Sequence, residues 1–204
     1  MTGRFGKPLW KGSHVGARTT TRQKMLVSAV ELLRERGAAA VTVDAVLARS
    51  QAPRGSVYHH FPGGRGEIMS DALALAGDAI SSLIEQASTE GASAGLRRFG
   101  DFWSAILHDS DFGSGCPVMS VAVGGSPDDQ QLHAAATDIF QRWQHALERG
   151  IRADGVEAAR AHRLATIVLA ALEGAVVLCR AQRSTQPLDE VLAELDVLLT
   201  SAVR

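Results

Sequence analysis

The stretch VTVDAVLARSQAPRGSVYHHFPGGR, from Val41 to Arg65, carries the turn chemistry that decides the fold. Thr42 can cap a helix, because its hydroxyl can accept a backbone N–H, and Asp44 suits the positive end of the helix dipole. Pro53 suits the first turn of a further helix, since its fixed φ and missing N–H cost nothing there. The stretch therefore predicts two short helices, at about 42–50 and 53–61, in a helix-turn-helix arrangement.

Gly55 stands near the start of the second of these helices, although glycine costs roughly 1 kcal/mol relative to alanine in a helix. Helical geometry makes Val57 and Phe61 the inward side of the segment, so His59 is central on the opposite side, flanked by Gly55 and Ser56. A surface without a side chain lets the backbone approach a partner closely. The alternative is that glycine is merely tolerated here.

Charge is distributed unevenly along the chain. Residues 1–65 hold 11 Lys/Arg and 3 Asp/Glu, whereas residues 66–204 hold 10 and 19. This asymmetry indicates that the first third meets a polyanion, although a chance clustering of solvated charges gives the same count. The basic, Gly-rich residues 1–18 lack helical or strand periodicity and are expected to form a mobile arm.

Several kinds of protein are disfavoured by the composition. Only Cys116 and Cys179 are present, with no CxxC and no His/Cys cluster at zinc-like spacing, so no disulfide, metal site or cofactor is predicted. The N-terminus lacks the apolar segment of a secretory signal, which favours a cytoplasmic protein. The apolar run Leu164–Cys179 is 16 residues long and contains Glu173, so we expect a buried helix and no membrane partner.

Outside the first stretch the pattern is helical throughout, with no convincing strand. The start at Ser126–Asp129 is well marked by a capping serine, a proline at the first helical position and two carboxylates. Further helices are expected at about 20–36, 65–87, 94–108, 117–123, 126–152, 156–183 and from 187 to the end. The sequence therefore predicts an all-α fold of about nine helices.

The run Val41–Ile68 resembles the TetR family of transcriptional repressors. The matching elements are the capped second helix at Thr42, then Arg54-Gly55-Ser56, Val57, Tyr58-His59-His60-Phe61, and the basic Arg65 that opens the fourth helix. Together with GCPV at 115–118, this variant is similar to the lincomycin- and flavonoid-responsive repressors. The chain departs from the family in its long basic arm and at Gly66, where the family often has an acidic or polar helix former.

The resemblance implies a two-part organisation. Residues 1–18 would be the flexible arm, 19–65 the three-helix DNA-binding domain, and 66–204 a larger helical domain for effector binding and dimerisation. It implies a homodimer on a palindromic DNA operator, released by a small apolar or aromatic ligand, without catalysis. Of the expected DNA-binding residues, Arg54 and His59 would reach the major groove beside Gly55 and Ser56, while Thr42, Tyr58, His60 and Arg65 would hold phosphates. An arginine can pair with guanine through two hydrogen bonds, whereas hydroxyls suit phosphate oxygens.

An effector pocket is expected among the fourth to eighth helices. It would combine apolar and aromatic side chains with a few polar groups, which is typical of ligand sites. The expected residues are Phe99, Phe102, Trp103, Cys116, Met119, His133, Thr137, Phe140, Trp143 and Glu173. For any one of them the alternative is plain core packing, and Glu173 could instead be satisfied at an interface.

The last two helices each carry an apolar stripe that a monomer would struggle to cover. These stripes predict a four-helix dimer interface formed by Leu164, Val168, Ala171, Leu172, Val176, Val191, Leu192, Leu195 and Leu199.

Other functions remain open at this point. Cys116 could act as a redox-sensing thiol, and with His108, Asp109 and Asp111 upstream it could be imagined as a thiol-enzyme nucleophile. A DNA-binding protein without a ligand is a further alternative. Turnover assays and DNA binding without any cofactor would separate these classes.

Overall fold

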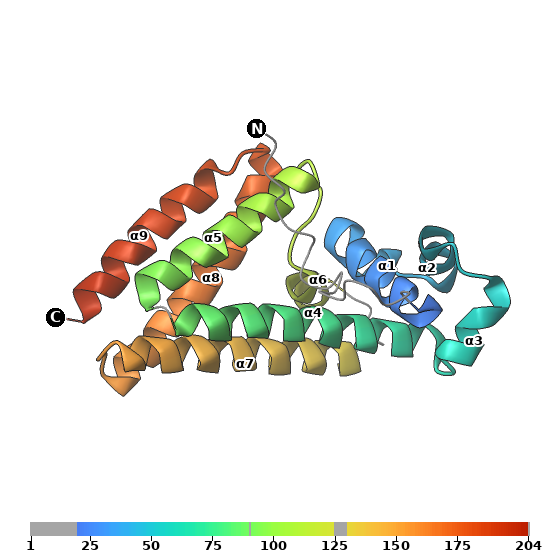
Figure 1. Ribbon diagram of the computed structural model, residues 1–204, viewed down its shortest axis with the longest axis horizontal. Coiled ribbons are helices and arrows are strands. Elements are labelled where there is room, and N and C mark those ends of the chain that lie inside the picture. The colour runs from blue at the N-terminus through green and yellow to red at the C-terminus, as the bar shows by residue number, and fades with distance from the viewer. Residues whose placement is uncertain (1–19, 90, 125–129, 204) are drawn as a thin grey trace. The chain divides into compact units, whose positions relative to one another are not determined.

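The computed structural model describes residues 20–89, 91–124 and 130–203, and within these ranges all regular structure is helical (Figure 1). The α-helices are α1 (Thr21–Arg36), α2 (Val43–Ser50), α3 (Val57–His60), α4 (Gly64–Ser88), α5 (Ala92–Asp109), α6 (Pro117–Val123), α7 (Gln130–Ala153), α8 (Ala158–Gln182) and α9 (Gln186–Ala202). Two short 3₁₀ helices, η2 (Ala38–Ala40) and η3 (Arg54–Ser56), accompany them. The predicted all-α fold with nine helices is confirmed for the described part of the chain.

The ends of the first two helices follow the capping rules. Thr20 Oγ1 accepts the amide of Gln23 at 3.2 Å, and Thr42 Oγ1 accepts the amide of Ala45 at 3.1 Å. Each hydroxyl satisfies one of the backbone donors that a helix start leaves without a partner. The predicted start of α2 at Thr42 is therefore confirmed.

The segment after Pro53 differs from the prediction. A single helix over 53–61 was expected, but the chain forms the 3₁₀ turn η3 and then the four-residue α3. Proline disfavours helical backbone in the residue before it, and Phe61, before Pro62, has φ −141° and ψ 78°. Glycine at position 55 also lowers helix propensity. The continuous helix was wrong because the sequence offers too few helix-forming positions between these breaks.

The described residues form two compact units. The N-terminal unit comprises residues 20–79, 116–124 and 130–139, and the C-terminal unit comprises residues 80–89, 91–115 and 140–203. In the N-terminal unit α1 packs against α2 and α6; in the C-terminal unit α8 and α5 pack against α9. The helices α4 and α7 each contribute residues to both units. The expected arm, 1–18, and the expected helix start at Ser126–Asp129 lie outside the described residues.

The most apolar helix is α8, which by length and composition could cross a membrane. It packs against α9 and α5, and the side chains that it buries there include Leu164, Val168 and Leu172. A core helix with this pattern passes the same length and composition test. Glu157 caps it by accepting the amides of Ala159 and Arg160 at 2.8 and 2.9 Å. The expected buried helix is therefore only partly buried, since Ile167, Val177 and Leu178 stay about half exposed.

Candidate DNA-binding surface and ligand cavity

The segment 54–60 has one buried side and one open side. Val57 and the following Phe61 are fully buried, and the guanidinium of Arg22 lies over the Phe61 ring, 4.9 Å from its centre. On the other side Tyr58 is 67% exposed, and His59 is exposed beside it. The two apolar residues thus anchor the segment while its polar residues face solvent.

The residues before α3 also leave their polar groups accessible. The Arg54 side chain is 88% exposed, and its nearest acidic partner is Asp44 at 3.7 Å, itself 81% exposed. Gly55 is exposed, and a Cβ built there would meet nothing within 4 Å. Ser56 is half-buried and donates a hydrogen bond to the Pro53 carbonyl at 2.6 Å. The guanidinium of Arg54 is therefore available to an incoming partner.

Arg65 occupies a different environment. Its Nε donates to the carbonyl of Val41 at 2.8 Å, and its Nη2 donates to the carbonyl of Ala38 at 3.1 Å. Thr42, exposed beside Val41, uses its hydroxyl as a helix cap, and His60 is half-buried with its ring 4.9 Å from that of His59. Phosphate contacts by Thr42, Tyr58, His60 and Arg65 stay predictions, and for Arg65 the donors named here are occupied within the protein.

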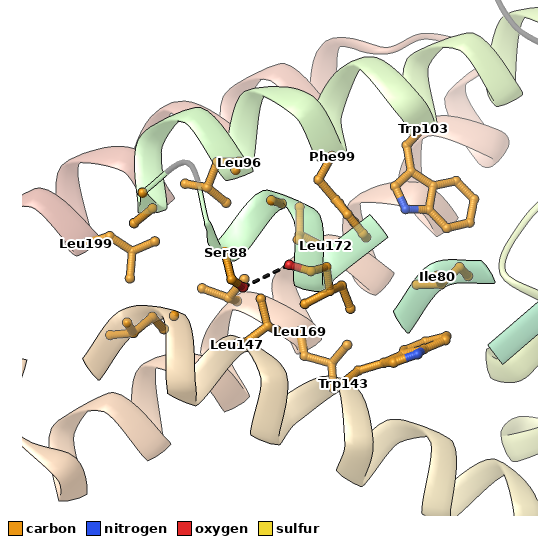
Figure 2. Close-up of a pocket in the computed structure, with 18 of the residues that line it drawn as sticks. Ile80, Ser88, Leu96, Phe99, Trp103, Trp143, Leu147, Leu169, Leu172 and Leu199 are labelled. Carbon is orange, nitrogen blue, oxygen red and sulfur yellow. Dashed lines mark hydrogen bonds between the residues drawn. The ribbon is translucent and has the colours of Figure 1, made fainter. Parts of the chain in front are cut away.

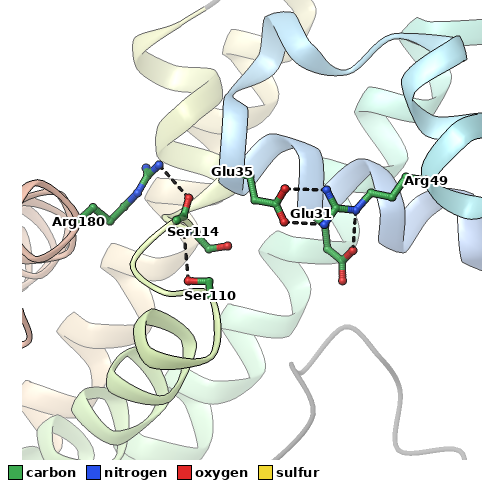
Figure 3. A network of polar contacts seen from close by, with 7 residues as sticks. Glu31, Glu35, Arg49, Ser110, Ser114 and Arg180 are labelled. Atoms are coloured by element: carbon green, nitrogen blue, oxygen red, sulfur yellow. Dashed lines mark hydrogen bonds and ion pairs between the residues drawn. The ribbon is translucent and has the colours of Figure 1, made fainter. Parts of the chain in front are cut away.

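A charged cluster joins α1 to α2 (Figure 3). Both Nη atoms of Arg49 donate to the Glu35 carboxylate at 2.6 Å, and its Nε donates to Glu31 at 3.0 Å. The hydrogen bond from Arg49 lowers the pKa of Glu35, more than burial raises it. This arginine therefore acts inside the helix-turn-helix and fixes how its two first helices meet.

The C-terminal unit encloses an apolar cavity (Figure 2). Phe99 and Trp103 reach it from α5, and Trp143 and Leu147 reach it from α7. Trp143 is almost completely buried and donates from Nε1 to Ser81 Oγ at 3.1 Å. The lining also includes Ile80, Ile84, Ala87, Ser88, Gly91, Ala92, Gly95, Leu96, Gly150, Ile151, Val168, Leu169, Leu172, Glu173 and Leu199. Among the described lining residues, Glu173 is the one titratable side chain.

The structure brings part of the predicted pocket together. Phe99, Trp103, Trp143 and Glu173 line the cavity. Two further aromatic residues lie in the C-terminal unit without lining the cavity: Phe102 packs edge-on against Trp103 and Phe140 against Trp143, with ring centres 5.5 and 5.3 Å apart. The remaining four, Cys116, Met119, His133 and Thr137, belong to the N-terminal unit and do not line this cavity.

The lining residues of α4 were missed because their signal is weak. Ile80, Ile84 and Ala87 follow helical spacing, which any core-facing stripe shows. The small residue Gly95 allows the backbone of α5 to come close to Ala87 of α4, and this glycine within a helical pattern was the available clue.

The two thiols are shielded. Cys116 is 5% exposed and its Sγ accepts the amide of Met119 at 3.5 Å, while Cys179 is fully buried. Burial raises the pKa of the Cys179 thiol. Among the described residues, no group of His, Cys, Asp and Glu could hold a metal ion.

The predicted dimer stripes lie largely inside the C-terminal unit. Buried there are Leu164, Val168, Leu172, Val176, Leu195 and Leu199, whereas Ala171, Val191 and Leu192 are half-buried. The sequence shows an apolar stripe, but it does not distinguish a partner helix of the same chain from a second copy. Large apolar side chains that remain exposed on α8 and α9 are Ile167, Val177, Leu178 and Val197, at 47%, 49%, 48% and 65%.

Two family models match the chain. The model for bacterial regulatory proteins of the tetR family matches residues 25–66, and that for the C-terminal domain of LmrA/YxaF-like transcriptional regulators matches residues 92–194. The first match includes α2, η3 and α3, and the second includes the cavity walls formed by α5, α7 and α8.

Curated relatives and a solved structure agree with these matches. An HTH-type transcriptional regulator of Mycobacterium tuberculosis H37Rv is 40% identical over 183 residues, which cover 87% of this chain and 93% of the relative. The HTH-type transcriptional repressor DhaR of Mycobacterium sp. GP1 is 28% identical, over 86% and 90%. A cysteine mutant of the TetR family regulator CifR, solved with a 26-bp operator DNA, shares the fold with a TM-score of 0.68 at 18% identity, over 91% of this chain and 98% of that one.

These relatives are transcriptional regulators, which confirms the non-enzyme interpretation. The helix-turn-helix geometry, the two family matches and the 40% identical relative lead to one conclusion. The chain belongs to the TetR family of DNA-binding transcriptional regulators.

Proposed function

We propose that the protein is a repressor that occupies a palindromic operator as a homodimer in the cytoplasm and leaves it when a small apolar or aromatic ligand binds. Residues 19–65 would bind DNA, and residues 66–204 would bind the effector and form the dimer. The observation that carries the proposal is the segment 54–60, which is anchored by buried Val57 and presents Arg54, Tyr58 and His59 to solvent.

Base reading is assigned to Arg54 and His59. Arg54 is almost fully exposed and can offer two parallel donors to guanine in the major groove. Gly55 lets the backbone beside it come close to the bases, since no side chain stands in between. The relative DhaR is named a transcriptional repressor, and this name supports repression for the present protein.

Dimerisation is assigned to the exposed side of α8 together with α9. Ile167, Val177 and Leu178 are each about half exposed, and Gly174 lies near them with open space where a Cβ would be. Two copies of such a face can approach closely and remove this apolar surface from water. Two-fold symmetry would then require a palindromic operator.

The ligand site is assigned to the cavity of the C-terminal unit. Its volume is about 60 Å³, counted as the space open to the centre of a water molecule, so a drug-sized ligand must enlarge it. Aromatic walls at Phe99, Trp103 and Trp143 favour a flat apolar ligand, and Ser88 and Glu173 offer polar contacts that orient it.

Release would require the ligand to prefer the state that does not bind DNA. The helix α4 contributes Ile80 and Ile84 to the cavity, and its first turn contains Arg65 next to the DNA-binding segment. A tenfold loss of operator affinity needs about 1.4 kcal/mol of coupling between the two sites. Linkage makes the effect reciprocal, so operator DNA must weaken ligand binding by the same factor.

Two measurements test the proposal. Footprinting on DNA that flanks the protein's own gene should reveal a protected palindrome. If no tested DNA shows such a protected palindrome, the proposed operator binding is wrong. Ligand titrations followed by Trp103 and Trp143 fluorescence should then give weaker binding when that operator is present. Equal ligand affinities with and without operator would leave a ligand-indifferent regulator or control through Cys116.

A further inference from the structure

The side chain of Arg65 crosses from the first turn of α4 to the turn that precedes α2. Its Nε and Nη2 donate to the carbonyls of Val41 and Ala38 at 2.8 and 3.1 Å. The planar guanidinium presents donors in a fixed fork, which suits two acceptors at fixed positions. Both acceptors belong to the segment around η2, directly before the Thr42 cap.

This contact closes the helix-turn-helix at its base. The hydrogen bond between Arg65 and Val41 spans 24 residues, and between its ends lie α2, the turn and the segment 54–60. Because Thr42 follows Val41, holding the Val41 carbonyl fixes the point at which α2 begins. The position of the Arg65 side chain therefore constrains every element that would face DNA.

A second arginine, Arg22, makes contacts on another side of the helix-turn-helix. Arg22 of α1 forms an ion pair with Asp71 of α4, and its guanidinium covers the ring of Phe61. The end of the recognition segment is thereby fixed between α1 and α4. Together Arg22 and Arg65 join α1, the η2 turn and the first two turns of α4.

The environment of Arg65 contrasts with that of Arg54. Arg65 is half-buried and has two donors bound to backbone carbonyls, whereas the Arg54 side chain is 88% exposed. To bind a phosphate through these donors, Arg65 would have to leave both carbonyls. The Ala38 oxygen would keep the amide of Val41 at 3.2 Å, but the carbonyl of the fully buried Val41 would lose its Arg65 donor, which is costly. The Nε and Nη2 donors of Arg65 are therefore engaged with the backbone that precedes α2.

We propose that Arg65 is a positioning residue that sets the orientation of the segment 54–60, and that it is not a phosphate ligand. It acts through Val41 and the start of α2. The proposal rests on the operator binding proposed above and replaces the phosphate role that the family resemblance implies for this residue.

Equilibrium titrations at several salt concentrations test this role. The probes are the duplex protected in footprinting and a scrambled duplex of the same composition. In Arg65→Met, operator affinity should fall by about tenfold because base contacts become misplaced, while binding to the scrambled duplex stays as in the wild type. The slope of log K against log salt should not change, because no phosphate contact is lost.

The charge-retaining variant Arg65→Lys separates the two roles further. A lysine is a point charge that can hold a phosphate but cannot reproduce the rigid fork. We therefore expect Arg65→Lys to lose operator discrimination in the same direction as Arg65→Met. Wild-type behaviour of Arg65→Lys, together with a uniform loss and a slope smaller by about 0.9 in Arg65→Met, would establish a phosphate ligand and overturn the proposal.

Hydrogen exchange without DNA gives an independent readout. The amides of Ala45 and Val46, at the start of α2, should exchange faster in both Arg65 variants than in the wild type, at a temperature where thermal unfolding shows all three folded. Unchanged exchange and an unchanged ratio of operator to scrambled affinity would also overturn the proposal. If the wild type itself shows no preference for any duplex, the proposed operator binding fails instead.

Discussion

Gly95 in α5 lies directly against the backbone of Ala87 in α4, and a Cβ at position 95 would come within 2.9 Å of the Ala87 carbonyl oxygen. A backbone atom cannot rotate away as the end of a side chain can. Both residues line the cavity, so this close contact sets one of its walls. The φ of Gly95 is not positive, so glycine is not needed here for an unusual backbone conformation. It is needed because the two helices lie too close together for a side chain at this position.

Replacing this glycine should therefore weaken the fold. We expect Gly95→Ala to lower the free energy of unfolding by about 1–3 kcal/mol, the usual cost of overpacking, despite the better helix propensity of alanine. The control is Gly66→Ala in α4, where a Cβ would meet nothing within 4 Å. That variant should be neutral or more stable by up to about 1 kcal/mol in urea denaturation. Equal shifts in both variants would contradict the packing argument.

The contact between Arg49 and Glu35 should stabilise the helix-turn-helix. Arg49→Gln removes a two-pronged ion pair and the bond to Glu31, so we expect a loss of about 1 kcal/mol at pH 7. Lys24→Gln, at an exposed position of α1, should change the free energy of unfolding by less than about 0.5 kcal/mol. The two variants are compared by urea denaturation, and an Arg49→Gln loss no larger than that of Lys24→Gln would show that the cluster adds nothing.

The same cluster should give an acid-dependent stability. Arg49 lowers the pKa of Glu35 in the folded protein below its ordinary value of 4.5. A group with a lowered folded pKa contributes stability above its unfolded pKa and loses it as the pH falls through the folded pKa. The stability difference between the wild type and Arg49→Gln should thus be complete above about pH 5 and shrink below pH 4.5. A difference that stayed constant down to pH 3 would exclude this linkage.

Both cysteines should be slow to react in the folded protein. Cys116 and Cys179 are buried, and burial raises the pKa of the Cys179 thiol, so little thiolate is exposed near neutral pH. Ellman's reagent should therefore label both rapidly only after denaturation, and hydrogen peroxide should leave operator affinity unchanged. Rapid labelling of one thiol in the native state, absent in Cys116→Ser, would instead favour redox control.

Exposed apolar residues on α8 should hold the dimer together. Ile167→Glu places a charge on a side chain that is 47% exposed, so it should give a monomer at micromolar concentration in sedimentation velocity without unfolding the chain. Val123→Glu on α6 changes a side chain that is 73% exposed and should leave the mass unchanged. A dimeric Ile167→Glu protein would place the interface elsewhere.

Helix-capping residues, and prolines at helix starts, made much of the fold predictable. Thr42 caps α2 as its hydroxyl predicts, and α6 begins at the predicted Pro117. The split of the recognition segment into η3 and α3 was not predicted, because periodicity over a few residues does not distinguish a 3₁₀ turn from an α-helix.

Tertiary contacts set the limit of prediction for the candidate sites. Leu172 and Leu195 were assigned to a dimer surface because their stripe is apolar, yet a stripe does not reveal which helix covers it. The place of Arg65 in the motif predicts a phosphate ligand. Its hydrogen bonds to the carbonyls of Val41 and Ala38, which indicate a positioning role, are visible only in the structure. Such contacts depend on how the helices pack, which residue type and spacing leave open.

The open space around Gly55 makes this position suitable for engineering. No atom lies within 4 Å of a Cβ built there, and the backbone φ is not positive, so the fold itself accepts any ordinary residue. A side chain added at this point would extend outward beside Arg54 and His59. Because the proposed DNA contact needs the backbone to come close, a substitution at position 55 separates the two demands: it should weaken operator binding at little cost in folding.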